Sequence, residues 1–321
     1  MSTPLVSIIL PTYNGEAFLE NQLDSIFEQS FKDFEIIVSD DGSSDSTTEI
    51  INTWKNRKNF RYSINQKNIG FIQNFCQAAK RAEGKYIVPC DQDDVWLPHK
   101  LQILIDSIND HLLIYSNSRL IDEQEQPLGK SLKESLKVNF ISGNNHRAFY
   151  YANCVAAHTM MFHRDLLQYI DTLPETVFHD HWLAYVASRL GSIKALDDEL
   201  VLYRRHGSSV TTTTKKKRFT GNLFSYLKAK ADRQFERNQN KITKLRTFQA
   251  FNQKIAKPDS ELDVLIEELS RFDEYFFNKQ IFSILNRSKD DYFAISCKGK
   301  MKLMMEECFG RKFYQYIPMT F

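Results

Sequence analysis

Residues 86–94 read Tyr86-Ile87-Val88-Pro89-Cys90-Asp91-Gln92-Asp93-Asp94, an apolar run that ends in three carboxylates within four positions. The run is short and apolar enough to be a strand buried in a sheet. Carboxylates placed this closely repel one another unless a cation lies among them, and their oxygens suit a hard divalent ion. The segment therefore predicts a buried strand that carries a metal site, and the protein's chemistry, at its carboxyl end.

Two earlier segments show the same pattern of an apolar run followed by a polar cluster. Residues 5–10 lead into Thr12-Tyr13-Asn14, and residues 34–39 lead into Asp40-Asp41-Gly42-Ser43. The expected strands are 5–10, 34–39, 60–64 and 86–89, and the expected helices are 15–29, 43–54 and 71–82. Pro11 is expected to end the first strand, because proline lacks the N–H of a central ladder. Repeated strand and helix at this spacing predict an α/β fold with a mostly parallel, doubly wound sheet.

The three polar clusters all follow expected strands, namely those ending near residues 10, 39 and 89. In open parallel sheets, ligands bind beyond the carboxyl ends of the strands. We therefore expect these loops to converge on one polar site.

The rest of the chain continues this alternation and then changes character. The expected elements are helices at 98–109, 164–170 and 178–190 and strands at 111–116, 156–162, 193–195 and 200–204, with a loop excursion over 122–150. From about residue 215 the pattern is that of long helices broken at Pro258. We therefore expect one part over residues 1–210 and a helical C-terminal region over 211–321.

Composition excludes several classes of protein. The chain has 321 residues, 42% of them hydrophobic, which is enough for a core and a second, smaller element. It has no run of about 18 apolar residues and no basic leader, so we expect no membrane span and a cytoplasmic location. The five cysteines are scattered without a Cys-x-x-Cys pair, which argues against disulfides and zinc. No zinc-finger, RNP or homeodomain pattern is present, so we expect no nucleic-acid partner.

The ordered motifs of the first 210 residues resemble family 2 glycosyltransferases, which are nucleotide-sugar-dependent enzymes of the GT-A fold. The matching segments are residues 6–14, residues 40–47, Asn68-Ile69-Gly70 and Asp91-Gln92-Asp93-Asp94. Several motifs in order are more specific than a lone Asp-x-Asp. The resemblance implies a Rossmann-like GT-A catalytic domain over residues 1–210 and does not cover the helical extension.

A narrower likeness concerns residues 91–96, His179-Asp180-His181-Trp182 and residues 202–206. These segments resemble bacterial rhamnosyltransferases, which build cell-surface polysaccharide from dTDP-β-L-rhamnose. The resemblance implies inverting transfer from a UDP- or dTDP-sugar, with dTDP-L-rhamnose as one candidate. The acceptor would be a hydroxyl of a growing surface polysaccharide or of a lipid-linked saccharide.

The departing nucleoside diphosphate gains negative charge, so Mg²⁺ or Mn²⁺ bridging its phosphates would stabilise the transition state. The resemblance implies Asp93 as a metal ligand, with Asp91 sharing the metal or holding the ribose hydroxyls. His206 would be a further metal ligand or pyrophosphate contact, and Arg204 would fork onto phosphate oxygens. The alternatives are an acidic helix cap for Asp94 and a surface loop position for His206.

The nucleotide end of the donor is assigned by the same resemblance. Asp41 matches the residue that accepts a hydrogen bond from N3–H of uracil or thymine, and Tyr13 matches the ring that stacks on the base. Pro11 belongs to the same motif, while Asn68 and Gly70 match a donor-contact loop. Cytosine has an acceptor at that edge, so Asp41 selects against it. The alternative for Asp41 is a turn at Asp-Gly.

Inverting transfer needs a base to take the proton of the attacking hydroxyl. Asp180 matches that position, and its place at a helix start keeps a carboxylate ionised, although a structural cap would show the same placement. His179, Trp182 and Trp96 are expected to contact the acceptor, with core packing as the alternative for the tryptophans.

The C-terminal region is basic: residues 1–210 hold 20 Lys and Arg against 27 Asp and Glu, whereas residues 211–321 hold 22 against 13. Lys215-Lys216-Lys217-Arg218 precedes apolar residues at helical spacing (Phe219, Leu223, Phe224, Leu227). This segment could rest on anionic lipid at the inner face of the plasma membrane, which a lipid-linked acceptor would make useful. The alternative is packing on the catalytic domain or on a second copy in a homodimer.

Other functions compete with this interpretation. A phosphatase of the haloacid dehalogenase type also uses Asp-x-Asp after a strand, but normally after the first strand, and the cluster at 40–43 would then have no role. A nicotinamide dehydrogenase lacks support, because residues 11–15 contain no Gly-x-Gly-x-x-Gly turn. An inactive scaffold subunit is disfavoured by the retention of Asp41, Asp91, Asp93 and Asp180 together.

Overall fold

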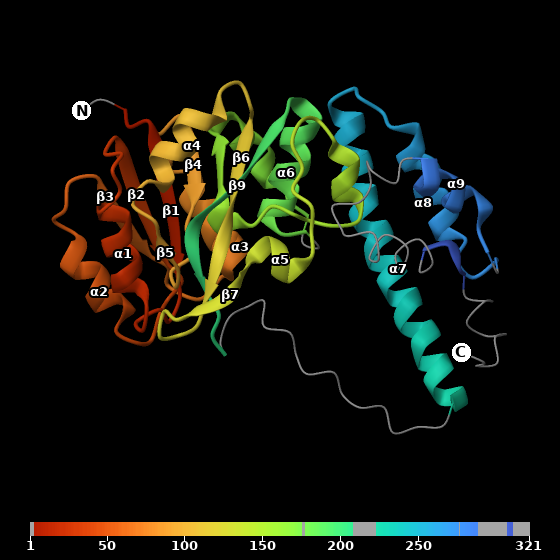
Figure 1. Cartoon of the computed structure of the whole chain (residues 1–321), viewed down its shortest axis with the longest axis horizontal. Coiled ribbons are helices and arrows are strands. Elements are labelled where there is room, and N and C mark those ends of the chain that lie inside the picture. The colour runs from red at the N-terminus through yellow and green to blue at the C-terminus, as the bar shows by residue number, and fades with distance from the viewer. Residues whose placement is uncertain (1–2, 175–176, 208–222, 276, 288–306, 311–321) are drawn as a thin grey trace. The chain divides into compact units, whose positions relative to one another are not determined.

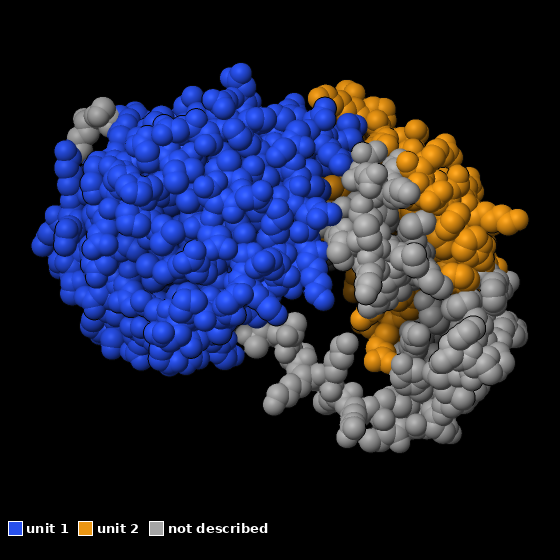
Figure 2. Space-filling view, in the orientation of Figure 1, with its two compact units in different colours: residues 1–146, 153–173, 178–212 blue, residues 147–152, 174–177, 213–321 orange. Residues whose placement is uncertain are grey.

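The structure, a computed structural model, describes residues 3–174, 177–207, 223–275, 277–287 and 307–310 (Figure 1). The chain forms two compact units, coloured separately in Figure 2. Unit 1 holds residues 1–146, 153–173 and 178–212, and unit 2 holds residues 147–152, 174–177 and 213–321. The two units therefore divide close to the expected boundary, but two short segments of the first 210 residues belong to unit 2.

The N-terminal half of unit 1 is a parallel sheet. Its strands are β1 (Val6–Thr12), β2 (Phe34–Asp40), β3 (Phe60–Ile64) and β4 (Tyr86–Pro89), in the order β3-β2-β1-β4. Apart from Pro11, which is partly buried, β1, β2 and β4 are buried along their whole length, as their near-continuous apolar sequences require. The predicted α/β class is thereby confirmed.

Helices cover both faces of this sheet. The helices are α1 (Leu19–Phe27), α2 (Thr47–Trp54), α3 (Phe71–Ala79) and α4 (Lys100–Ile108). Helices α1, α2 and α4 share one apolar cluster with alternate strand residues such as Ile8, Val38 and Val88. Helix α3 packs on β1 and β2 from the opposite face of the sheet. Strand residues that alternate with those of the apolar cluster, such as Ile9, point toward that face.

The rest of unit 1 extends the sheet with mixed pairing. Its elements are β5 (Val95–Trp96), β6 (Leu113–Ile121), β7 (Pro127–Ser131), α5 (Leu132–Leu136), η2 (Ala157–Thr159), β8 (Met160–His163), η3 (Arg164–Thr172), α6 (His179–Leu190) and β9 (Ile193–Arg204). The order continues from β4 as β8-β6-β9-β5, and β7 pairs with β6. Strand β9 runs parallel to β6, whereas β8 and β5 run antiparallel to their neighbours.

Three local predictions differ from the structure. Pro11 does not end β1, because it still pairs with Ser39 of β2. On the other side of β1, the pairing with β4 ends at Ile9. The backbone of Pro11 therefore needs no hydrogen bond on that side, and a proline is tolerated there. The expected loop over 122–150 contains β7, α5 and the 3₁₀ helix η1 (His146–Tyr150). The expected helix after Arg164 is a 3₁₀ helix.

Unit 2 is helical, with α7 (Leu223–Lys254), α8 (Ser260–Ser270) and α9 (Lys279–Arg287). The buried Asp259 side chain caps α8 by accepting from the backbone N–H groups of Glu261 and Leu262, at 3.1 and 3.2 Å. None of the described helices is long and apolar enough to cross a membrane. The basic segment 215–218 and Phe219 lie outside the described residues, as do the side chains of Leu223, Phe224 and Leu227.

Candidate active site

The loops after β1 and β2 are joined at the carboxyl edge of the sheet. The backbone N–H of Asp41 donates to the carbonyl of Thr12 at 2.8 Å, and the Thr12 hydroxyl donates to the Asp40 carboxylate at 2.9 Å. The Asn14 side chain accepts from the backbone N–H of Ser44 at 2.9 Å. The predicted convergence of these loops is therefore present.

Asp41 organises the loop that precedes α3. Its carboxylate accepts from the Asn65 amide and from the backbone N–H groups of Ile69 and Gly70, each at 2.9 Å. Gly70 has a φ of 89°, which only glycine adopts readily, and its N–H also donates to the side-chain oxygen of Asn68 at 3.0 Å. The predicted nucleotide contacts Asp41, Asn68 and Gly70 thus lie in one hydrogen-bonded cluster, with the Asp41 side chain largely buried.

Tyr13 presents an exposed ring beside this cluster. The residue is 45% exposed, which is unusual for a large aromatic side chain, and the preceding Pro11 is partly buried in β1. The side-chain amide of Gln92 makes two hydrogen bonds with the Tyr13 backbone, at 2.9 and 3.0 Å. The loops after β1 and β4 are therefore also joined.

The carboxylates after β4 share their site with Asp180. The pKa of Asp91 is raised to about 7 by removal from water and by the charges of Asp93 and Asp180. Because 45% of the Asp91 side chain stays exposed to water, the charges of Asp93 and Asp180 are a main cause of this rise beside desolvation. Asp180 thus lies close enough to Asp91, 89 positions earlier in the sequence, for its charge to raise the pKa of Asp91.

Asp180 lies in the first turn of α6. Burial raises the pKa of its carboxyl to about 6, against hydrogen bonds from the backbone of His181 and Ala157 and from the side chain of Asn153. The bond from the His181 N–H is 2.6 Å long. A carboxylate with a pKa just below neutrality is ionised at pH 7 yet basic enough to accept a proton.

One group of three potential metal ligands among the described residues is Asp91, Asp94 and His158, whose donor atoms all lie within 4.8 Å of one another. Burial lowers the pKa of His158 to about 3, so the imidazole is neutral and keeps a lone pair for a metal. Asp94 is fully buried, and within the described structure its Oδ2 has no hydrogen-bond partner. This donor set fits a divalent cation; the sequence had placed Asp94 in the acidic cluster, with a helix cap as the alternative, but had not indicated His158.

The other two predicted metal ligands form a pair of their own. His206 Nε2 lies 2.7 Å from Asp93 Oδ2, and both side chains are mostly buried. The predicted set of Asp91, Asp93 and His206 is thus divided: Asp91 lies with Asp94 and His158, and Asp93 with His206. Their roles as ligands stay predictions.

A buried lysine accompanies the acidic cluster. Lys100 has no exposed surface, and its Nζ donates to the carbonyl of His158 at 2.7 Å and lies 3.5 Å from the centre of the Trp96 ring. Burial lowers its pKa to about 7, while the Asp94 and Asp91 carboxylates act in the opposite direction. When protonated, Lys100 places a positive charge close to these two carboxylates.

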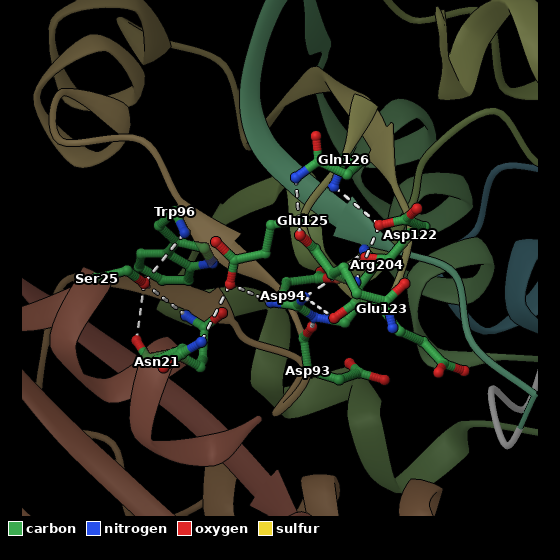
Figure 3. A network of polar contacts seen from close by, with 12 residues as sticks. Asn21, Ser25, Asp93, Asp94, Trp96, Asp122, Glu123, Glu125, Gln126 and Arg204 are labelled. Atoms are coloured by element: carbon green, nitrogen blue, oxygen red, sulfur yellow. Dashed lines mark hydrogen bonds and ion pairs between the residues drawn. The ribbon is translucent and has the colours of Figure 1, made fainter. Parts of the chain in front are cut away.

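The prediction that Arg204 contacts phosphate oxygens of the donor does not fit the structure. Its side chain is 1% exposed, and its guanidinium donates to the carbonyls of Asp93 and Glu123 and to the carboxylate of Glu125, at 2.8 to 3.1 Å. Its backbone N–H also donates to Asp94. Figure 3 shows Arg204 between the Asp93-Asp94 turn and residues 122–125. The guanidinium is thus engaged in fixing the acidic loop and has no open face for a pyrophosphate.

The predicted acceptor contacts are likewise packing residues. Trp96 is 2% exposed and belongs to the main apolar cluster, and Trp182 is 1% exposed with its indole N–H donated to the carbonyl of Tyr169. His179 stacks on Phe75 with ring centres 4.2 Å apart, and burial lowers its pKa to about 4. The expectation that these rings meet a sugar does not fit the structure, because their faces are covered by protein.

Comparison with known proteins agrees with this geometry. Residues 7–170 match the model of glycosyl transferase family 2. An uncharacterised glycosyltransferase of Nostoc sp. is 29% identical over 64% of this chain and 66% of its own length. One of Rickettsia felis is 31% identical over 69% of this chain and 37% of its own length. The matches thus span just under two thirds of the first relative and about a third of the second.

Two solved structures share the fold. A crystal structure of S. aureus TarS 1–349 in complex with UDP-GlcNAc has a TM-score of 0.55 at 18% identity, covering 97% of this chain and 89% of that chain. The mannosyltransferase PcManGT of Pyrobaculum calidifontis, in complex with GDP-Man and Mn²⁺, has a TM-score of 0.50 at 16% identity, covering 95% and 80%. These likenesses concern the fold alone. The matched family model spans just over half of the sequence, so the chain belongs to glycosyltransferase family 2 and has the GT-A fold.

Proposed function

We propose that this chain is an inverting, metal-dependent glycosyltransferase that moves a sugar from a UDP- or dTDP-sugar to a hydroxyl of a saccharide acceptor. The observation that carries the proposal is the shared site of Asp91 and Asp180, in which one acid belongs to the Asp-x-Asp loop and the other to α6. A reaction that neutralises a leaving diphosphate and deprotonates an alcohol needs both kinds of acid side by side.

The donor binds along the carboxyl edge of the sheet. The exposed Tyr13 ring stacks on the nucleobase, and Asp41 with the loop of Asn68 and Gly70 reads its polar edge. A uridine or thymidine base offers the N3–H that a carboxylate can accept. Support for a nucleotide sugar comes from TarS and PcManGT, whose structures contain UDP-GlcNAc and GDP-Man. A dTDP-L-rhamnose donor is one case of this proposal.

Mg²⁺ or Mn²⁺ would be held by Asp91 with Asp94 and His158, or by Asp93 with His206. When bound, the ion neutralises the charge that develops on the departing diphosphate. A metal in this position would also lower the raised pKa of Asp91, because a cation favours the ionised carboxylate. PcManGT, which has the same fold, contains Mn²⁺.

Asp180 is the base. Its carboxylate takes the proton of the acceptor hydroxyl as that oxygen bonds to the anomeric carbon, and the bond from this carbon to the diphosphate oxygen breaks on the opposite face. The hydrogen bonds from His181, Ala157 and Asn153 hold the carboxylate in place. One displacement of this kind inverts the anomeric configuration.

The acceptor is a growing surface polysaccharide or a lipid-linked saccharide in this proposal. Residues 211–321 would bring the catalytic unit to the inner face of the plasma membrane or pair two copies of the chain. The net excess of basic residues in this region supports the membrane role, since anionic lipid attracts Lys and Arg. Flotation of the full chain with anionic and neutral vesicles, beside sedimentation at several concentrations, distinguishes the two.

A panel of thermal melts tests the donor assignment. UDP-, dTDP- and GDP-sugars are added with Mn²⁺, with Mg²⁺ or with EDTA, since a ligand that binds the folded state raises the melting temperature. We expect uridine or thymidine nucleotides with a metal to raise it most. A melting temperature that no nucleotide sugar changes would contradict the proposal.

A further inference from the structure

Gln92, the residue between Asp91 and Asp93, has a role that the Asp-x-Asp pattern does not reveal. Its Oε1 accepts from the backbone N–H of Tyr13 at 2.9 Å, and its Nε2 donates to the carbonyl of Tyr13 at 3.0 Å. The side-chain amide therefore pairs with both backbone groups of one residue, as a neighbouring strand would. This pairing fixes the position and the rotation of the Tyr13 backbone relative to the acidic loop.

Gly15 makes room for this pairing. A Cβ atom at residue 15 would lie 2.3 Å from Gln92 Oε1 and 2.6 Å from its Cδ, which is far inside van der Waals contact. The Gly15 N–H is meanwhile donated to the hydroxyl of Thr47 at 2.8 Å, so the backbone has little freedom to move away. A side chain at residue 15 would therefore push the Gln92 amide away from the Tyr13 backbone.

The rest of the loop after β1 is held by other contacts. Asn14 donates its N–H to the Ser43 hydroxyl at 2.9 Å, and its side chain accepts from the Ser44 N–H at 2.9 Å. The hydrogen bonds from Gln92 therefore act on Tyr13 alone. Loss of the amide would release the Tyr13 backbone while leaving the loop and the sheet in place.

We infer that Gln92 is a positioning residue for the nucleobase: it holds the exposed Tyr13 ring in its stacking position and ties it to the loop that binds the metal. The inference rests on the proposed function, since it takes Tyr13 as the base-stacking ring. It predicts that the middle residue of the Asp-x-Asp loop determines affinity for the base of the donor, although it touches neither the base nor the metal.

The experiment separates the two ends of the donor by isothermal titration calorimetry. The probes are UDP with Mn²⁺, uridine alone and pyrophosphate with Mn²⁺, with dTDP and thymidine used instead if the wild type prefers them. In Gln92→Ala we expect uridine and UDP to bind about tenfold more weakly, the loss of roughly two hydrogen bonds. Pyrophosphate with Mn²⁺ should bind as before, because it has no base, and the donor KM should rise while kcat stays within about twofold.

Gly15→Ala completes a double-mutant cycle. In the wild-type background the new methyl group collides with the Gln92 amide, so uridine affinity should fall by about the same factor. In the Gln92→Ala background there is no amide to displace, and the second substitution should have almost no further effect. Gln102→Ala is the matched control: it removes a glutamine amide that bonds to Asp106 within α4 and touches neither loop.

Four outcomes would overturn the inference. Unchanged uridine affinity in Gln92→Ala would show that Tyr13 keeps its position without Gln92. An equal loss of affinity for pyrophosphate with Mn²⁺ would show that the substitution disrupts the whole site. Additive effects of the two substitutions would show that Gly15 and Gln92 act separately. If wild type binds pyrophosphate with Mn²⁺ but no nucleoside, the base site and this inference fail, whereas the metal site of the proposed function survives.

Discussion

His206 Nε2 lies 2.7 Å from Asp93 Oδ2, which joins the end of β9 to the loop after β4. The pair brings to the acidic loop an imidazole that lies just after β9, 113 positions later in the sequence. Imidazole and carboxylate groups both bind divalent metal ions, which is why Asp93 and His206 are proposed as ligands.

Removing Asp93 should weaken the effect of Mn²⁺ on donor binding. The factor by which Mn²⁺ increases the affinity for UDP should be at least about tenfold smaller in Asp93→Ala than in wild type, because a ligand carboxylate is lost. Titration of UDP with Mn²⁺ and with EDTA measures this. The exposed Asp106→Ala on α4 is the control, and an unchanged effect of Mn²⁺ in Asp93→Ala would remove Asp93 as a ligand.

Asp180→Asn should abolish turnover and spare donor binding. General-base catalysis contributes about a hundredfold or more, so we expect kcat to fall at least by that factor. Affinity for UDP with Mn²⁺ should stay within about twofold, since Asp180 acts on the acceptor. Asp165→Asn, on the exposed side chain at the start of η3, serves as control. Near-normal turnover in Asp180→Asn would exclude it as the base.

The raised pKa of Asp180 predicts an acid limb in the rate profile. With a folded pKa of about 6 the base is protonated in acid, so kcat should fall about tenfold per pH unit well below pH 6. The unfolded carboxyl titrates near 3.8, so the folded state binds more protons between these values and stability from this group is lost as pH rises through 6. Asp180→Asn should therefore melt higher than wild type at pH 8 and gain less at pH 5. A rate that is flat from pH 7 to pH 4.5 would contradict the role.

Lys100→Met should lower the stability of the protein, and added Mn²⁺ should restore part of that loss. Removing a buried cation from beside buried carboxylates costs about 3 kcal/mol, and Lys100 also supports the carbonyl of His158. We expect a lower melting temperature at pH 6, where Lys100 is charged, and a larger rise on adding Mn²⁺ than in wild type. Lys85→Met, at an exposed residue just before β4, is the control. An equal response to Mn²⁺ in both variants would show that Lys100 does not balance this charge.

Arg204→Ala should reduce stability before it affects donor binding. The substitution leaves Glu125 and two backbone carbonyls without their buried donor, which costs on the order of 3 kcal/mol. Denaturant unfolding measures this loss, with the half-exposed Arg119→Ala as control. Wild-type stability combined with a specific loss of pyrophosphate affinity would restore Arg204 as a phosphate contact.

Much of the first unit could be predicted because its determinants are local. The apolar runs of β1, β2 and β4 indicate buried strands, and their length and spacing indicate a parallel sheet. Parallel strands end at the same edge, so the polar residues after each run had to meet there. Strand direction alone sets this edge, whatever the direction of the individual side chains.

Residues whose roles depend on direction could not be assigned in this way. Trp96 and Trp182 are buried, and the Arg204 guanidinium donates to the carbonyls of Asp93 and Glu123 and to the Glu125 carboxylate, although motif position suggested ligand contacts for all three. His158 and Lys100 lie in segments with no motif of their own, and only the packing of η2 and α4 brings them to the acidic loop.

The amino-acid sequence by itself determined the parallel sheet and the gathering of Asp41, Asp91 and Asp93 at its edge, because hydrophobic burial and strand direction depend on residues that are near one another in the chain. The tertiary structure alone decided which neighbours those carboxylates have. Gln92 on Tyr13, His206 on Asp93 and Lys100 on His158 are contacts between distant segments, and their geometry depends on how the whole core packs.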